Sequence, residues 1–171
     1  MRYSVIDVVR SKIASVIFSG AGRYADPWHP FEETTAAIAQ AGLASRCRFQ
    51  AGSFFEQVPS GADVYLLKSI LHNWDDANCR RIVQTVRSAL PPDGRVLLLE
   101  RVRPERLRPG QRDEAVARTD LNMLAGLGGR ERSVAEYAAL LAPAGLAIAT
   151  VEPLGFEFSL VEVRVAASAA G

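Results

Sequence analysis

The stretch Asp63-Val-Tyr-Leu-Leu-Lys-Ser-Ile-Leu-His-Asn-Trp-Asp-Asp76 determines how the rest of the chain is interpreted. It opens with the apolar run Val64–Leu67, whose aliphatic and aromatic side chains are typical of a buried strand. Lys68 and His72 follow where this strand is expected to end. Good N-cap and first-turn residues for a helix come next, namely Asn73, Asp75 and Asp76. Because open α/β sheets bind ligands at the carboxyl ends of their strands, the stretch predicts a binding site at that edge.

The composition is that of an ordinary globular domain. Of the 171 residues, 49% are hydrophobic and 23% charged, which suits one domain with a core. The net charge of +1, without a block of lysine and arginine, argues against a nucleic-acid-binding surface. No apolar run reaches the length of a membrane span, and charges interrupt the N-terminal apolar residues, which argues against a signal peptide. Cys47 and Cys79 lack metal-ligand spacing and are expected to be reduced thiols of a cytoplasmic protein.

Hydrophobic periodicity predicts alternating strands and helices. Strands are expected over residues 3–9, 46–51, 64–67, 95–102, 146–153 and 158–165, and helices over 31–41, 76–90, 114–124 and 133–141. Residues 10–18 fit either a helix or a strand, residues 26–30 with two prolines a turn, and residues 104–112 a polar loop. Ser133-Val-Ala-Glu136 matches a capping box. The order predicts an α/β fold with a doubly wound, mostly parallel sheet that ends in an antiparallel hairpin.

Several motifs in the same order identify a family resemblance. They are the opening stretch, Pro91-Pro-Asp-Gly94, Glu100-Arg-Val-Arg-Pro104, Asp120-Leu-Asn-Met123 and Gly128-Gly-Arg-Glu-Arg-Ser133. From Phe31 to Val165 the chain resembles the S-adenosylmethionine-dependent O-methyltransferases, in the branch of plant caffeic-acid-type and bacterial polyketide and carotenoid enzymes. The resemblance implies a class I, Rossmann-like methyltransferase fold. It also implies that S-adenosylmethionine lies across the strand edge and that a hydroxyl of a small molecule, often phenolic, is methylated.

The resemblance implies a role for individual residues. His72 matches the general base of the family, and Glu100 and Glu131 match the two acids that bracket it. The positions that match the cofactor site are Asp26, at the ribose, and Ser53, Phe54 and Lys68, along the pocket. The substrate-side wall is matched by Asn122 and Met123.

The chemistry of a histidine and two acids supports these roles independently. A phenol has a pKa near 10 and a neutral imidazole one near 6.5, so a positioned histidine can take the proton as the oxygen attacks a sulfonium methyl. A carboxylate on the far ring nitrogen would stabilise the imidazolium. Each residue also has an ordinary structural interpretation: His72 as a surface or capping residue, Glu100 as a strand-end acid and Glu131 as a first-turn helix acid. The chain has two histidines and no ligand spacing, so a metal site is not expected.

Two segments depart from the family pattern. Family members carry a glycine-rich loop after the first strand, because glycine lets the backbone approach the cofactor closely. Here Val5-Ile-Asp-Val8 continues as Val9-Arg-Ser-Lys-Ile13, so either the loop is deleted or residues 1–25 come from an altered reading frame. Gly20-Ala-Gly22 is a poor substitute. Ser53 stands where the family has an acid, and replacing a charged hydrogen bond by a neutral one costs about 1 kcal/mol or more.

The expected organisation is an altered segment at 1–30, a catalytic domain at 31–166 and a disordered tail at 167–171. The helical dimerisation domain of the family is absent, so the homodimer that the resemblance implies would be weakened. The expected partner is a small-molecule hydroxyl acceptor, with neither nucleic acid nor membrane. The alternative from another class is a non-catalytic remnant with weak or no cofactor binding. A nicotinamide-dependent oxidoreductase would need Gly-x-Gly-x-x-Gly between a strand and a helix, which the sequence lacks.

Overall fold

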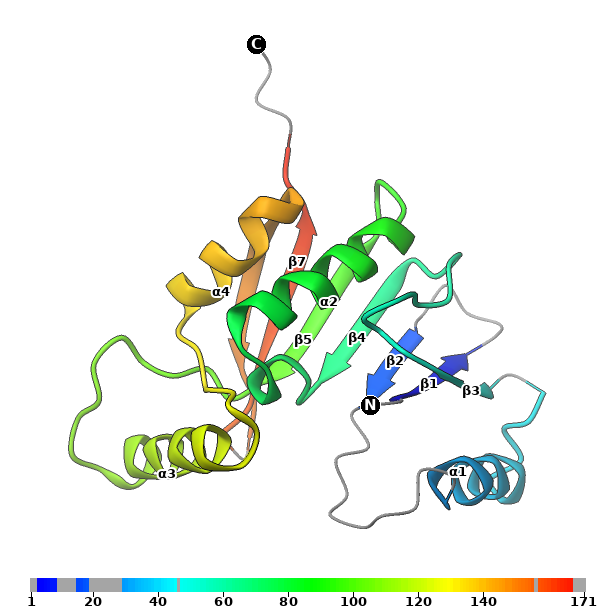
Figure 1. Cartoon of the computed structure of the whole chain (residues 1–171), viewed down its shortest axis with the longest axis horizontal. Helices are drawn as coiled ribbons and strands as arrows, with labels where there is room; N and C mark the ends of the chain where they lie inside the picture. Colours follow the sequence, from blue (N-terminus) through cyan, green and yellow to red (C-terminus); the bar gives the residue numbers. More distant parts are fainter. Residues whose placement is uncertain (1–2, 9–14, 19–28, 46, 156, 168–171) are drawn as a thin grey trace.

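A computed structural model describes residues 3–8, 15–18, 29–45, 47–155 and 157–167. Seven strands form one sheet in the order β3-β1-β2-β4-β5-β7-β6 (Figure 1). The strands are β1 (Tyr3–Val8), β2 (Ser15–Phe18), β3 (Cys47–Gly52), β4 (Val64–Lys68), β5 (Arg95–Glu100), β6 (Leu146–Pro153) and β7 (Ser159–Val165). The predicted α/β class is therefore confirmed. The ambiguous segment 10–18 contains a strand, β2, in the part that is described.

The sheet is mixed, and the prediction of a mostly parallel sheet is wrong. Only the β2–β4 and β4–β5 pairs are parallel among the described strands, and the other four pairs are antiparallel. The connection lengths explain this difference. Six residues separate β1 from β2, whereas a parallel crossover needs a dozen or more, so these neighbours must run antiparallel. The C-terminal hairpin β6–β7 is antiparallel, as predicted.

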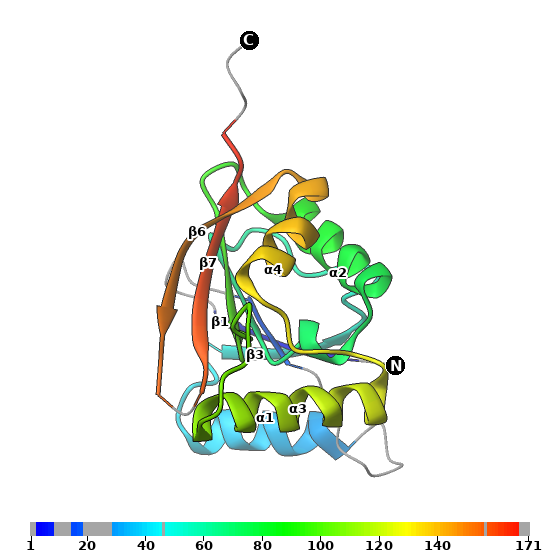
Figure 2. The same ribbon diagram turned by 90° about the vertical axis from the view of Figure 1, so that its left-hand side faces the viewer.

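The helices are α1 (His29–Gln40), α2 (Asp76–Ala89), α3 (Gln111–Leu127) and α4 (Val134–Leu141). α2 and α4 lie side by side on one face of the sheet, and α1 and α3 lie beyond the ends of its strands (Figure 2). α2 begins as predicted, because the Asp75 carboxylate accepts a hydrogen bond of 2.8 Å from the Asn78 amide. Ser133 and Glu136 form the predicted capping box at the start of α4.

The core fills the space between the sheet and these two helices. Along β5 the side chains alternate between half-buried and buried, so Val96 and Leu98 point to the helix side. Tyr65 and Leu67 of β4 and Ile82 of α2 are at most 1% exposed and belong to the same apolar cluster. The predicted apolar spacing of α2 is thus confirmed. None of the helices within the described ranges is both long and apolar enough to cross a membrane.

Several element boundaries differ from the predicted ones. α1 begins at His29 rather than Phe31, because Pro30 lies in the first turn, where the missing N–H of proline is tolerated. α3 is longer than predicted and ends at the left-handed Gly128. A short 3₁₀ helix, η1 (Leu71–Asn73), was not predicted. Asp26 lies outside the described residues.

The central position of α2 in the core leads to a test by mutation. Replacing Ile82 by alanine removes buried methylene groups and leaves a cavity, so the free energy of unfolding should fall by about 2–5 kcal/mol. Gln84→Ala, on the exposed side of the same helix, should change it by less than about 0.5 kcal/mol. Urea unfolding measures both values. Equal effects of the two substitutions would contradict this packing.

Candidate active site

The turn after β4 carries the predicted catalytic histidine into a buried position. The chain leaves β4 through Ser69, whose φ of 53° turns the backbone sharply into η1. The amides of Ile70 and Leu71 then donate hydrogen bonds of 3.0 and 2.9 Å to one oxygen, Oε1, of Glu100. This carboxylate, fully buried at the end of β5, therefore binds the start of the turn, as a side-chain cap does at a helix N-terminus. His72, in the middle of η1, is only 6% exposed.

His72 lies between two buried carboxylates. Its Nδ1 atom is 3.6 Å from Oε2 of Glu100 and 3.4 Å from Oε1 of Glu131. Both distances exceed an ordinary hydrogen bond, but they are short for charges in a buried site. Within the described part of the chain, neither oxygen of the Glu131 carboxylate has a hydrogen-bond partner. A proton on Nδ1 would point toward the Glu131 carboxylate. Both carboxylates approach this same nitrogen, so the Nε2 side of the ring faces away from them.

The two acids change the protonation of the histidine. Burial lowers the pKa of His72, but the contact with Glu131 and the charge of Glu100 outweigh burial, so its pKa is raised above 6.5. The pKa of Glu100 is raised from 4.5 to about 7, chiefly by burial and to a lesser extent by the charge of Glu131. The charge of His72 and the amides of Leu71 and Ile70 oppose this rise. His72 and Glu100 are therefore coupled, because each changes the pKa of the other, as an acid–base site requires.

Glu131 is positioned by two neighbouring segments. Its backbone amide donates a hydrogen bond of 2.8 Å to the carboxylate of Asp120 in α3. The following residue, Arg132, forms an isolated parallel bridge with Val102, just beyond β5. Glu131 is 1% exposed. Asp120 and Arg132 were not among the predicted site residues, although both stand in the motifs that were recognised, because a sequence does not reveal which letters of a motif touch the backbone.

The predicted cofactor-side residues lie at or near the carboxyl ends of β3 and β4. Lys68 ends β4 and is exposed, whereas Ser53 follows β3 and is half-buried. Within the described ranges, no atom comes within 4 Å of a Cβ built on Gly52, so these residues leave the end of β3 open. Phe54 is 1% exposed and contacts Phe55 and Trp74, so its described contacts are those of the core. The ammonium of Lys68 suits a ligand carboxylate, and the hydroxyl of Ser53 suits the hydroxyls of a sugar.

The glycine-rich loop was expected after residues 5–8, which lie in β1. The strand next to β4 is instead β2, in which Phe18 pairs with Lys68. In the sequence β2 is followed by Ser19-Gly-Ala-Gly22, which lies outside the described residues together with Asp26. The expectation built on Val5–Val8 therefore concerned a strand that lies one place further from β4.

The predicted substrate-side residues lie on α3, which contacts η1. Met123 is half-buried and its carbonyl accepts the Gly129 amide at 3.3 Å, whereas Asn122 is exposed. Among the described residues there is no cluster of three histidine, cysteine, aspartate or glutamate side chains that could hold a metal ion.

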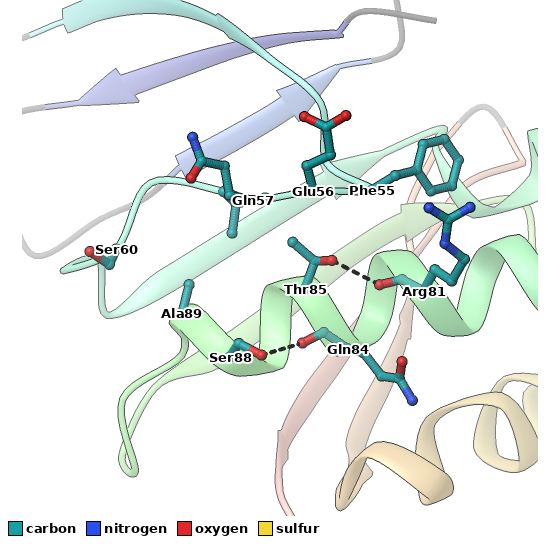
Figure 3. Close-up of a pocket in the computed structure, with 10 residues that line it drawn as sticks. Phe55, Glu56, Gln57, Ser60, Arg81, Gln84, Thr85, Ser88 and Ala89 are labelled. Carbon is teal, nitrogen blue, oxygen red and sulfur yellow. Dashed lines mark hydrogen bonds between the residues drawn. The ribbon is translucent and has the colours of Figure 1, made fainter.

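A surface groove of about 420 Å³ lies between α2 and residues 55–60 (Figure 3). Arg81 and Thr85 of α2 line it opposite Phe55 and Gln57, and it contains none of the predicted site residues. The Arg81 guanidinium lies 5.0 Å from the centre of the Phe55 ring, which also packs against Trp74, with ring centres 4.9 Å apart. Trp74 thus packs against the rings of Phe54 and Phe55.

Comparison with known proteins identifies the family. A family model for the O-methyltransferase domain matches residues 31–147. The chain belongs to this family. A mitomycin biosynthesis 6-O-methyltransferase from Streptomyces lavendulae is 41% identical over 134 residues, which cover 78% of this chain and 37% of the relative. The aclacinomycin 10-hydroxylase RdmB from Streptomyces purpurascens is 38% identical over 140 residues, covering 78% of this chain and 36% of that protein.

A solved structure confirms the predicted class I methyltransferase fold. NcsB1, an O-methyltransferase from neocarzinostatin biosynthesis, was crystallised with S-adenosylmethionine and 2-hydroxy-5-methyl naphthoic acid. It matches with a TM-score of 0.70 and 34% identity, over 80% of this chain and 38% of its own. The chain thus spans less than half the length of the curated relatives that it matches.

The carboxylates beside His72 should control its titration. The imidazole C–H signal of His72 in NMR should titrate above pH 6.5, and Glu131→Gln should lower that pKa because the largest stabilising contact of the imidazolium is lost. The chain has only one other histidine, His29, so a His29→Gln variant assigns the signals. An unchanged titration in Glu131→Gln would contradict the contact.

Glu100 should make stability depend on pH. Its folded pKa of about 7 lies above the ordinary 4.5, so the folded state binds this proton more tightly than the unfolded state. The resulting stabilisation is complete below the ordinary pKa and is lost as pH rises through about 7, amounting to about 3 kcal/mol at most. Glu100→Gln, which keeps an oxygen for both amides, should flatten this dependence in urea unfolding between about pH 5 and about pH 8. An identical slope in both proteins would refute the assignment.

Proposed function

We propose that this chain transfers a methyl group from S-adenosylmethionine to a hydroxyl oxygen of a phenolic or polyketide-type small molecule, with His72 as the general base. The observation that carries the proposal is the buried imidazole between Glu100 and Glu131, at the carboxyl end of two parallel strands. Such a site both accepts a proton and stabilises the charge that results.

The chain's own residues would act on the acceptor hydroxyl. With both acids at Nδ1, the Nε2 atom of His72 would take the proton of the acceptor hydroxyl and so make its oxygen nucleophilic toward the methyl group that the bound cofactor would supply. General-base catalysis of this kind contributes about 10²–10⁴-fold. Alignment of the oxygen with the methyl group contributes more, up to roughly 7–11 kcal/mol in favourable cases. Glu100 and Glu131 stabilise the imidazolium and fix the orientation of the ring, as an acid does behind a catalytic histidine.

Lys68 and Ser53 are the described residues that would hold the cofactor, and Asp26 is proposed for the ribose. When bound, S-adenosylmethionine supplies an electrophilic methyl group on a positively charged sulfur. The ammonium of Lys68 suits a carboxylate and the hydroxyl of Ser53 suits a hydrogen-bonding group. Phe54 is proposed to support the pocket from the core side.

The substrate class rests on the relatives. NcsB1 was solved with a hydroxynaphthoic acid, and the mitomycin relative is named as a 6-O-methyltransferase. An aromatic hydroxyl acceptor, bounded by Met123 and Asn122, is the proposal for this chain. A homodimer and a cytoplasmic location remain predictions from the sequence.

Family membership alone does not fix the reaction, because RdmB, at 38% identity, is named a hydroxylase. The His72 site favours methyl transfer, since its histidine and two acids are suited to removing a hydroxyl proton. The same site weighs against a non-catalytic remnant. A chain without function has no need to keep two carboxylates buried around an imidazole, which is costly without a paired charge.

The proposal is tested by binding and by turnover. The purified chain should bind S-adenosylmethionine at micromolar concentrations in calorimetry and methylate a hydroxynaphthoic acid. His72→Ala should abolish methyl transfer while sparing cofactor binding, because the histidine acts on the acceptor side. Absence of measurable binding at millimolar cofactor would refute the proposal and favour a non-catalytic remnant. If His72→Ala transferred methyl groups as fast as the unmodified chain, His72 would be excluded as the general base.

A further inference from the structure

An arginine side chain, Arg132, is buried beside the turn that carries His72, and the proposed methyl transfer does not use it. Arg132 is 0% exposed, although it follows Glu131 directly and belongs to no helix or named strand. Arginine is almost never buried without charged or polar partners that satisfy its donors. The partners of Arg132 therefore show what holds it there.

The guanidinium of Arg132 binds the backbone of the turn that carries His72. Nη1 donates a hydrogen bond of 2.9 Å to the carbonyl of Leu71, and Nη2 donates one of 2.8 Å to the carbonyl of Trp74. These carbonyls belong to residues on either side of the segment His72–Asn73. The planar guanidinium holds its donors in a fixed fork that suits two such acceptors, whereas the donors of a lysine rotate about a single nitrogen.

The same side chain is fixed at its other edge by an acid. Nε and Nη2 donate hydrogen bonds of 3.1 and 2.8 Å to Oδ1 of Asp76, the first residue of α2. The backbone of Arg132 pairs with the segment after β5, where the Arg103 amide donates to the Arg132 carbonyl at 2.9 Å. Arg132 thus connects three segments: the end of β5 with Glu100, the turn with His72, and the start of α2.

The glycine three residues earlier shows how tightly this segment lies against the turn. A Cβ built on Gly129 would stand 2.0 Å from the His72 carbonyl oxygen and 2.5 Å from the Asn73 carbonyl carbon. Only a residue without a side chain permits that approach. The segment Gly129–Arg132 therefore holds the turn from one side, while Glu100 binds its amides from the other.

We propose that Arg132 is a positioning residue for His72: its guanidinium fixes the turn Leu71–Trp74 and thereby sets where the imidazole stands between Glu100 and Glu131. This inference rests on the proposed function for its kinetic consequence, but the position of the imidazole can be measured without turnover. Arg132 acts through the backbone and is not assigned a contact with substrate or cofactor.

Arg132→Lys is the decisive variant, because it keeps the positive charge and loses the planar fork. We expect kcat to fall about 10²-fold, the loss that a displacement of about 1 Å causes, with KM for S-adenosylmethionine unchanged. The pKa of His72, measured by NMR, should move toward its ordinary value of 6.5, because the imidazole moves away from Glu131 and Glu100. The remaining charge that acts on His72, Arg101, is untouched.

Arg130→Lys is the matched control. Arg130 Nη2 donates 2.9 Å to Oδ2 of the same Asp76, but its side chain is 45% exposed and its only other described side-chain contact is Glu136. The control should leave kcat and the His72 titration unchanged. Asp76→Asn, in which Arg132 stays but loses its ionic anchor, should move the His72 pKa in the same direction as Arg132→Lys and by less.

The outcomes separate the two proposals. A His72 titration that is unchanged in a folded Arg132→Lys, with only a lower unfolding temperature, would overturn the positioning role and leave Arg132 a stability residue. If Arg132→Lys does not fold, the His72 titration of Asp76→Asn decides whether Arg132 positions the imidazole. A shifted titration in a chain whose unmodified form transfers no methyl group would uphold the positioning role and reject the proposed function.

Discussion

The site depends on the buried carboxylate of Glu100, which acts in two directions. Oε1 accepts the amides of Ile70 and Leu71, and Oε2 faces His72. A carboxylate without exposure to water is costly unless hydrogen bonds and an opposite charge compensate it. The turn supplies the hydrogen bonds and the histidine supplies the charge. The acid therefore positions the base and at the same time depends on it.

The sheet brings these groups together through the register of two parallel strands. Lys68, the last residue of β4, pairs with Leu99, so the turn after β4 emerges beside Glu100. The Ser69 amide continues the pairing with a hydrogen bond of 3.0 Å to the Leu99 carbonyl. Carboxyl ends of parallel strands meet at one edge, and this geometry explains why residues 28 apart in the sequence form one site. A shift of the register by one residue would turn the Glu100 side chain to the opposite face of the sheet.

The sequence predicted well those parts that local patterns determine. The strand β4, the helix α2 with Asp75 among its expected cap and first-turn residues, the capping box of Ser133 and the terminal hairpin were all predicted from composition and spacing. The direction of β1 was not, because strand direction depends on connection length and on pairing partners that no local pattern reports. Pro30 was interpreted as a break, although its place in the first turn of α1 is compatible with a helix.

The candidate site shows the same division between local and distant information. His72, Glu100 and Glu131 were predicted together from the family motifs, and the structure brings these three together. Asp120 and Arg132, which hold the backbone around them, could not be assigned, because their partners are backbone groups and a carboxylate 11 to 61 residues away. Such contacts leave no periodic signal in the sequence. Position in a motif indicates that a residue matters, but the fold decides whether it acts or supports.

Two arginines bind the same carboxylate, and the contrast between them explains why one is buried. Arg130 reaches Asp76 from the surface, where an ion pair contributes little, about 0–1 kcal/mol. That contact alone would give the Asp76 carboxylate, at the start of α2, a partner of opposite charge. Burying Arg132 as well incurs a large desolvation cost, which an ion pair by itself often fails to offset. What the buried arginine adds is its bonds to the Leu71 and Trp74 carbonyls, so the benefit of burying it lies in the geometry of the turn and hence in the position of His72.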